Sequence, residues 1–170
     1  MSHRHIDTIN FSLSTFCNMK CPDCCCNITH MQNKDKRFFS WEYLENAAKY
    51  LKGLYRIHLT GGEPTLHPHF RDFVPGIKSL FECEILTIET NGFGFKKFPA
   101  SFIFFDRIYI SHYTKETFPD SPDNTEDINF IKEYYKGYSK PEIIVGEVAH
   151  TSRETRGTKK CARGYDSNAA

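Results

Sequence analysis

The chain has 170 residues, of which 39% are hydrophobic and 25% are charged, and its formal net charge is +1. This length and composition predict one globular domain with an ordinary core, and the small net charge does not indicate nucleic-acid binding. No apolar run is long enough to cross a bilayer, and residues 1–20 lack the pattern of a signal peptide. We therefore expect a soluble, cytoplasmic protein with no membrane partner.

The first predicted elements are a strand, a loop rich in cysteine and a helix. Residues 8–14 alternate apolar and polar side chains, as a strand does. A polar loop follows, and it holds five of the seven cysteines within residues 17–26. Ser40 has the side chain of a helix N-cap, apolar residues recur after it at helical spacing, and Gly53 is expected to end this helix.

The same succession of strand, loop and helix repeats along the chain. A strand is predicted at 55–60, then the loop GGEPTLHP, then a helix around residues 70–80 that Pro75 is expected to kink. The remaining predicted strands, with a helix around residues 128–135 before the last of them, are 84–90, 106–111 and 142–148.

Strands separated by helices predict βα units and a parallel sheet, which is an α/β fold. We expect about five to six such units in a partial, open (β/α) barrel, because a closed eight-stranded barrel needs about 250 residues. The carboxyl ends of all strands then lie at one edge, where the sites of such sheets form. The cysteines, the GGEP segment and the polar strand ends should therefore converge.

An odd number of cysteines does not suit a disulfide framework, and clustered thiols in a reducing compartment are more often metal ligands. Cys17, Cys21 and Cys24 form the pattern CxxxCxxC directly after the first strand, and GGEP (61–64) closes the second. Together these motifs resemble those of the radical S-adenosylmethionine (radical SAM) superfamily, over about residues 8–148. The resemblance implies an enzyme that cleaves S-adenosylmethionine reductively and abstracts a hydrogen from a small-molecule or peptide substrate.

The resemblance also implies a cofactor site. Cys17, Cys21 and Cys24 would hold three irons of a [4Fe-4S] cluster and leave the fourth iron to S-adenosylmethionine. The Glu63 carboxylate would accept hydrogen bonds from the methionyl ammonium of that cofactor. At Asp23, where the family often has an aromatic residue, the backbone would contact adenine. The other positions implied as cofactor-binding are Gly61, Gly62, Thr90, Asn91, Ser111 and Glu147.

Other interpretations stay open. Cys21 and Cys24 could form half of a zinc site, although a second pair at zinc-finger spacing is missing from the sequence. The Gly-Gly and Asn-Gly dipeptides could be plain turns. The chain could then be a degenerate or non-catalytic iron–sulfur or zinc-binding protein that keeps the fold without turnover.

The sequence does not single out a catalytic residue, and the candidates are Cys25, Cys26, His112 and Cys161. Cys25 and Cys26 could instead be spare thiols, substitute ligands or packed small side chains. We expect residues 1–150 to form the radical SAM-like domain and residues 151–170 a basic tail, where a lone cysteine cannot build an auxiliary cluster. Electrons would come from a flavodoxin or ferredoxin-type donor, because a second redox centre is not evident.

Overall fold

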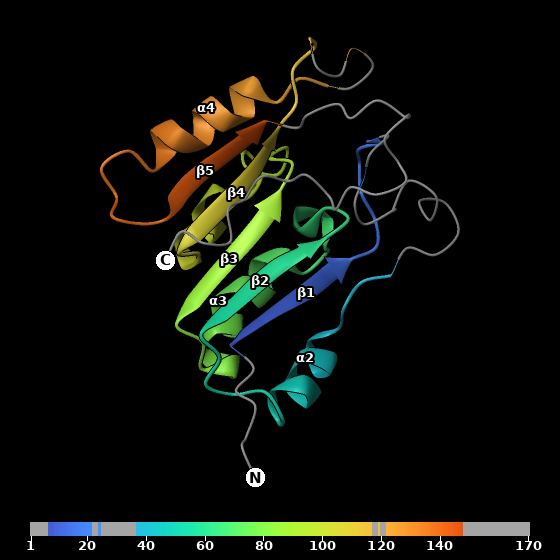
Figure 1. Cartoon of the computed structure of the whole chain (residues 1–170), viewed down its shortest axis with the longest axis vertical. Coiled ribbons are helices and arrows are strands. Elements are labelled where there is room, and N and C mark those ends of the chain that lie inside the picture. The colour runs from blue at the N-terminus through green and yellow to red at the C-terminus, as the bar shows by residue number, and fades with distance from the viewer. Residues whose placement is uncertain (1–6, 22–23, 25–36, 117–118, 120–121, 148–170) are drawn as a thin grey trace.

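The computed structural model describes residues 7–21, 24, 37–116, 119 and 122–147. It contains a five-stranded sheet in the order β1-β2-β3-β4-β5, and every neighbouring pair of strands is parallel (Figure 1). The strands are β1 (Thr8–Ser14), β2 (Arg56–Gly61), β3 (Ile85–Thr90), β4 (Arg107–His112) and β5 (Glu142–Glu147). The expected open, parallel α/β arrangement is confirmed, and all strand arrows point to the same edge.

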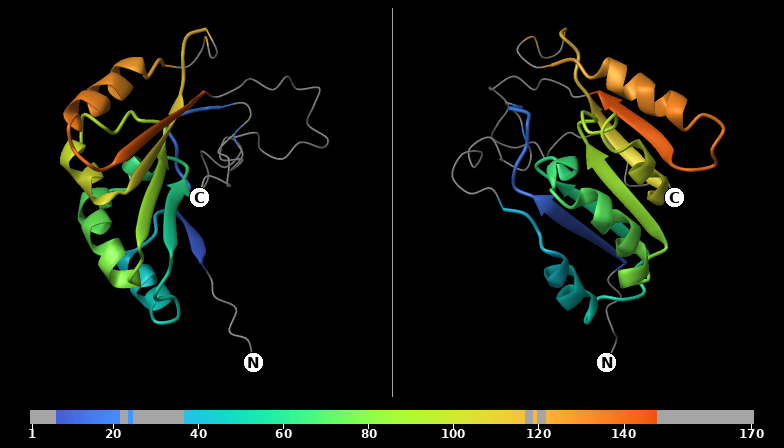
Figure 2. Two further views of the ribbon diagram at one scale, coloured as in Figure 1. Left: turned by 60° about the vertical axis from the view of Figure 1, so that its left-hand side comes forward. Right: turned by 180° about the vertical axis from the view of Figure 1, so that it is seen from behind.

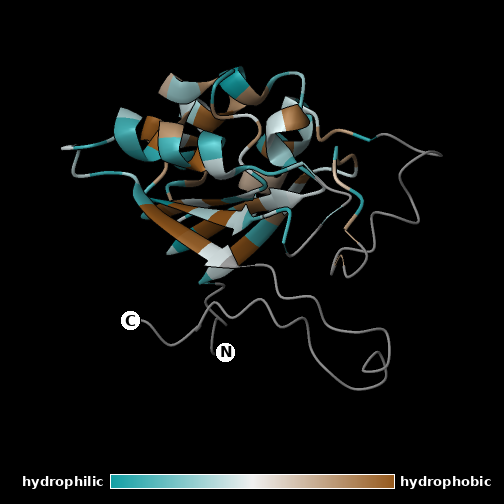
Figure 3. Cartoon of the chain, turned by 90° about the horizontal axis from the view of Figure 1, so that it is seen from above, coloured by the Kyte–Doolittle hydropathy of each residue, from teal (hydrophilic) through white to brown (hydrophobic). Residues whose placement is uncertain are grey.

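The helices lie on one face of this sheet, as the views from the side and from above show (Figures 2 and 3). They are α2 (Trp41–Ala48), α3 (Phe70–Phe81) and α4 (Thr125–Tyr134), with two short 3₁₀ segments, η1 (Pro64–Leu66) and η2 (Pro99–Phe104). Ser40 caps α2 as expected, since its Oγ accepts a hydrogen bond from Tyr43 N at 3.2 Å. The expected end at Gly53 was wrong, because α2 stops at Ala48 and Gly53 instead turns the chain toward β2.

The core lies between the sheet and these helices. Alternate strand residues such as Leu59, Ile88 and Ile110 are fully buried there, and they pack with Phe70 and Ile77 of α3. Helix α3 continues through Pro75 as one helix. The apolar face of each strand therefore points toward the helices, and the intervening residues occupy the opposite face of the sheet.

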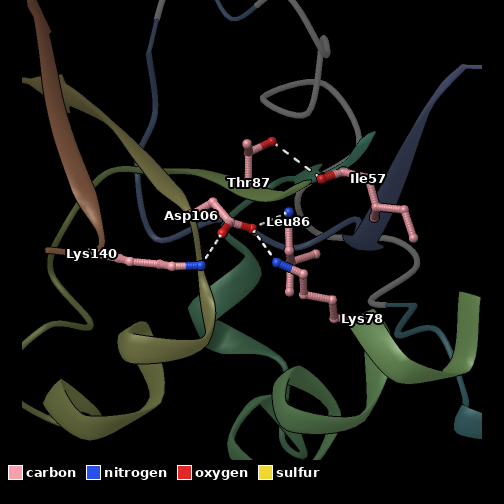
Figure 4. A network of polar contacts seen from close by, with 6 residues as sticks. All are labelled: Ile57, Lys78, Leu86, Thr87, Asp106 and Lys140. Atoms are coloured by element: carbon pink, nitrogen blue, oxygen red, sulfur yellow. Dashed lines mark hydrogen bonds and ion pairs between the residues drawn. The ribbon is translucent and has the colours of Figure 1, made fainter. Parts of the chain in front are cut away.

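The amino edge of the sheet is tied together by Asp106, which precedes β4 (Figure 4). One carboxylate oxygen accepts from Lys140 Nζ at 2.8 Å, and the other accepts from Lys78 Nζ at 2.7 Å and Leu86 N at 2.8 Å. Burial alone would raise the pKa of Asp106, but these hydrogen bonds hold the pKa below its ordinary value. The network joins β3, β4, α3 and Lys140, which lies two residues before β5, at the edge opposite the cysteines.

Several sequence predictions fall outside the described residues. They concern Asp23, Cys25, Cys26, Cys161 and the tail at 151–170. In the part of the chain that the structure describes, none of the helices combines the length and hydropathy that crossing a membrane requires.

Candidate functional site

The cysteine loop begins where β1 ends, and the GGEP segment holds it there. Ser14 Oγ accepts a hydrogen bond from Phe16 N at 2.9 Å and donates one to Phe16 O at 3.1 Å, which turns the chain sharply. Gly62 N donates to Ser14 O at 2.6 Å, and Glu63 N donates to Phe16 O at 2.8 Å. The two motifs are therefore one unit of structure, joined by backbone hydrogen bonds immediately before Cys17.

The two glycines of GGEP are needed for this close contact. Gly61 has φ 136°, a conformation that other residues rarely adopt. A Cβ on Gly62 would overlap the carbonyl group of Phe16 and lie 3.0 Å from Cys17 N. The resemblance implied that Gly61 and Gly62 bind the cofactor, and the structure shows the cysteine loop of the same chain lying close to both glycines.

The three cysteines of CxxxCxxC are outside any disulfide, and all are partly exposed. Cys17 Sγ accepts a hydrogen bond from Met19 N at 3.4 Å, and Cys24 N donates to Cys21 O at 3.3 Å. Burial raises the pKa of the Cys17 thiol to about 12, against the effect of the Met19 hydrogen bond. The charges of Glu63, Cys21 and Cys24 raise the pKa of Cys17 as well.

Among the residues that the structure describes, no three His, Cys, Asp or Glu side chains are arranged as ligands of one metal ion. The chemistry of the donor set nevertheless fits an iron–sulfur cluster, because three thiols lie on one loop and outside any disulfide. Thiols bind metals as thiolates, so a bound cluster would remove the protons that burial now favours.

Glu63 connects the strand ends. Its side chain is 1% exposed. Oε1 accepts hydrogen bonds from Thr65 N at 3.1 Å, Thr65 Oγ1 at 2.6 Å and Thr90 Oγ1 at 2.7 Å, and Oε2 accepts from Asn91 N at 2.8 Å. Burial raises the pKa of Glu63, while these hydrogen bonds lower it. The carboxyl group thus fixes the end of β3 beside η1.

Asn91 connects Glu63 to the cysteine loop. Its Nδ2 donates to Asn18 Oδ1 at 2.8 Å and lies 4.0 Å from Cys17 Sγ. Thr90 and Asn91 are both buried, and Gly92 has the positive φ of a turn. The Asn-Gly dipeptide is therefore both a turn and a contact to the loop that carries the cysteines.

A buried asparagine that the sequence analysis missed holds the next strand ends in place. Asn124 is 0% exposed, and its Nδ2 donates to Asn91 O at 2.7 Å and to Ser111 O at 2.8 Å. Its Oδ1 accepts from Tyr113 N at 2.9 Å. Asparagine directly before a helix indicates an N-cap, but this side chain makes no capping bond to α4. It binds the carboxyl ends of β3 and β4 instead.

The remaining expected residues are placed at the end of β4 and β5. Ser111 is buried, whereas His112 Nε2 lies 2.9 Å from Thr125 Oγ1 at the start of α4. Because residues alternate along a strand, His112 points to the helix-covered face and Ser111 to the other. Glu147 pairs in register with His112 at the last position of β5. His112 and Ser111 therefore lie on opposite faces of the sheet.

Polar residues alternate with the core residues along β2 and β3, so their side chains lie on the face of the sheet opposite the helices. His58 Nδ1 lies 2.7 Å from Thr87 Oγ1, and its Nε2 lies 3.6 Å from Glu89 Oε2. The hydroxyl of Thr87 donates to Ile57 O, so it accepts from His58 Nδ1–H, and Nε2 is the nitrogen toward Glu89. The ring of Tyr109 lies 5.8 Å from that of His58. This polar group lies on the same face as Ser111.

Comparisons with known proteins agree on one family. Residues 11–134 match the model of the radical SAM superfamily. Molybdenum cofactor biosynthesis protein 1 of Drosophila melanogaster is 35% identical over 91 residues, which are 52% of this chain and 16% of that protein. The GTP 3',8-cyclase of Helicobacter pylori is 32% identical over 103 residues, 56% of this chain and 30% of the enzyme. A probable GTP 3',8-cyclase of Saccharolobus islandicus is 32% identical over 123 residues, which are 68% of this chain and 38% of that protein.

Solved structures show the same fold. BtrN in complex with AdoMet and 2-DOIA has a TM-score of 0.63 at 16% identity, covering 83% of this chain and 56% of BtrN. SuiB of Streptococcus suis bound to S-adenosylmethionine has a TM-score of 0.57 at 17% identity, covering 91% of this chain and 43% of SuiB. This chain spans well under half the length of the curated relatives cited above. The family model covers most of the chain, and with the cysteine pattern and the fold it shows that the chain belongs to the radical SAM superfamily.

Proposed function

We propose that this chain is the cofactor-cleaving domain of a radical SAM enzyme, with Cys17, Cys21 and Cys24 as ligands of its cluster. Enzymes of this superfamily use a [4Fe-4S] cluster and S-adenosylmethionine. A cluster held by these cysteines would supply the electron for reductive cleavage of S-adenosylmethionine, and this cleavage would in turn provide for abstraction of a hydrogen from the substrate. The observation that carries the proposal is the pairing of GGEP with the cysteine loop through Gly62 N and Glu63 N.

The residues around Glu63 are proposed to bind S-adenosylmethionine. Among the described residues Oε1 accepts three hydrogen bonds and Oε2 accepts one, so Oε2 is the oxygen with more capacity for a further donor. Oε2 is therefore our acceptor for the methionyl ammonium, while Oε1 fixes the edge on which the cofactor would lie. Thr90 and Asn91 would act mainly by shaping this edge, because their side chains are already bonded to Glu63 and Asn18.

The substrate is proposed to be a small molecule or a peptide that lies against the polar face of the sheet. His58, Glu89 and Tyr109 supply hydrogen-bonding groups on that face, and Ser111 shares it at the carboxyl edge. The names of the cyclase relatives contain a nucleotide, GTP, which supports the small-molecule alternative. We propose a flavodoxin or ferredoxin-type protein as electron donor, and the cytoplasm as location, because the thiols must stay reduced.

Anaerobic reconstitution tests the proposal. The wild-type chain with iron and sulfide should take up about four irons, and with dithionite it should convert S-adenosylmethionine to methionine and 5'-deoxyadenosine. Cys24→Ala should lose both properties. Cys83→Ala is the matched control, because Cys83 is also a free cysteine but lies in the main core.

Two results would favour the alternatives. A chain that carries the cluster and binds S-adenosylmethionine, yet releases no 5'-deoxyadenosine with dithionite, would indicate the degenerate, non-catalytic protein. A chain that binds zinc tightly and never assembles the cluster would indicate the zinc-binding one. Equal iron uptake by Cys24→Ala and the wild type would remove Cys24 from the ligand set.

A further inference from the structure

Tyr113 lies against the cysteine loop. It follows β4 and is 5% exposed, and with Met19 it forms a small core of its own, to which Cys17, Cys21 and Phe93 are packed. The phenolic oxygen of Tyr113 is 3.4 Å from Cys21 Sγ. The Tyr113 hydroxyl therefore contacts a thiol of the CxxxCxxC motif directly.

The position of Tyr113 is fixed from behind by Asn124. Tyr113 N donates to Asn124 Oδ1 at 2.9 Å, and Asn124 N donates to Tyr113 O at 3.2 Å. Asn124 is itself anchored to Asn91 O and Ser111 O. The ring is therefore held relative to two strand ends, so its contact with Cys21 does not depend on the cysteine loop alone.

The direction of this hydrogen bond must reverse when a metal binds. In the structure the thiol of Cys21 donates to the Tyr113 oxygen at 3.4 Å. A cysteine that binds iron has lost its proton to solvent and can only accept a hydrogen bond. A tyrosine hydroxyl keeps its proton at neutral pH and can both donate and accept. The Tyr113 hydroxyl would then donate to the Cys21 sulfur.

A hydrogen bond to a cluster sulfur has a known physical effect. It draws negative charge from the thiolate, which stabilises the reduced, more negative cluster and raises its reduction potential. We propose that Tyr113 is a positioning residue of this kind, whose hydroxyl donates to Cys21 Sγ and makes the [4Fe-4S] cluster easier to reduce. The inference rests on the proposed function, since Cys21 must be a ligand of the cluster.

The test is Tyr113→Phe in the full chain, reconstituted anaerobically, with the midpoint potential measured by EPR-monitored redox titration. Tyr113→Phe should take up as much iron as the wild type and have a more negative midpoint. Tyr135→Phe is the matched control, because the hydroxyl of Tyr135 is also hydrogen-bonded but donates to Pro99 O at the helix side. Its midpoint should equal that of the wild type.

A second variant covers the case in which Tyr113→Phe fails to load. Tyr113→3-fluorotyrosine keeps the ring and makes the hydroxyl a stronger donor, so its midpoint should move in the positive direction. An unchanged midpoint in the variants that load would overturn the inference and leave the proposed function standing. Failure of the wild type and Tyr135→Phe to take up iron would overturn both.

Discussion

Replacing Gly62 by alanine should damage the cysteine loop without touching a cysteine. The Cβ of alanine would overlap the carbonyl carbon and oxygen of Phe16, and these are backbone atoms that cannot rotate away. Either the overlap persists or the cysteine loop moves off the GGEP turn. In the second case the chain loses the hydrogen bonds from Gly62 N to Ser14 O and from Glu63 N to Phe16 O.

The two outcomes have similar costs. Overpacking in a well-packed region costs about 1–3 kcal/mol. Each lost backbone hydrogen bond costs about 0.5–1.5 kcal/mol, so two cost about 1–3 kcal/mol. We therefore expect the free energy of unfolding of Gly62→Ala to fall by about 1–3 kcal/mol. Because Cys17 follows the displaced carbonyl directly, cluster uptake should fall as well.

Urea unfolding under anaerobic conditions and iron content after reconstitution measure these effects. Gly53→Ala is the control: a Cβ there meets nothing within 4 Å, although φ is 65°. It should lose about 1–2 kcal/mol from the left-handed conformation alone and keep full iron uptake. If Gly62→Ala matched the wild type in unfolding and in iron content, the cysteine loop would not depend on its contact with GGEP.

Two further predictions concern Glu63 and Asp106. Glu63→Gln should keep iron uptake but weaken S-adenosylmethionine binding by about ten-fold or more, because a charge-assisted contact is worth roughly 1.5–3 kcal/mol. Anaerobic titration with S-adenosylmethionine measures this affinity. An unchanged affinity would leave Glu63 only its structural role. Asp106→Asn should lower the free energy of unfolding by about 1–2 kcal/mol at neutral pH, since it weakens bonds to Lys78 and Lys140. Because the folded-state pKa of Asp106 is depressed, the difference should be fully present above about pH 4 and should shrink progressively as the pH falls from there through the folded-state pKa. An equal difference in urea unfolding at pH 7 and pH 3 would contradict this.

The sheet could be predicted from the sequence because its signals are local. Residues such as Ile57 and Leu59 alternate with polar neighbours, and this pattern survives in the structure as one apolar and one polar face. Helix ends were harder to predict. Helix α3 ends at Phe81, and the residue that caps it is Glu82 with φ 52°, not a glycine that the sequence would reveal as a helix end. The extent of α2 was overestimated because Gly53 lies beyond a turn that the periodicity does not reveal.

From the sequence, the candidate site could be predicted only as a group of motifs that meet at the carboxyl ends of the strands. The motifs placed Cys17, Glu63 and Asn91 near one another, and the structure brings them together. The contributions of Tyr113 and Asn124 could not be predicted, because they depend on contacts between residues far apart in the sequence. Asn124 also carries a misleading local signal, since its residue type before a helix indicates a cap.

The order of the strands in the sheet is also their order in the chain, and this has a consequence during synthesis. Each strand can pair with the one made just before it, so the sheet can grow as the ribosome advances. The cysteine loop is supported in stages, first by Glu63, then by Asn91 and last by Asn124. We expect ribosome-bound chains that expose residues up to 134 to protect this loop from protease, and chains that expose only residues up to 80 to leave it open to cleavage.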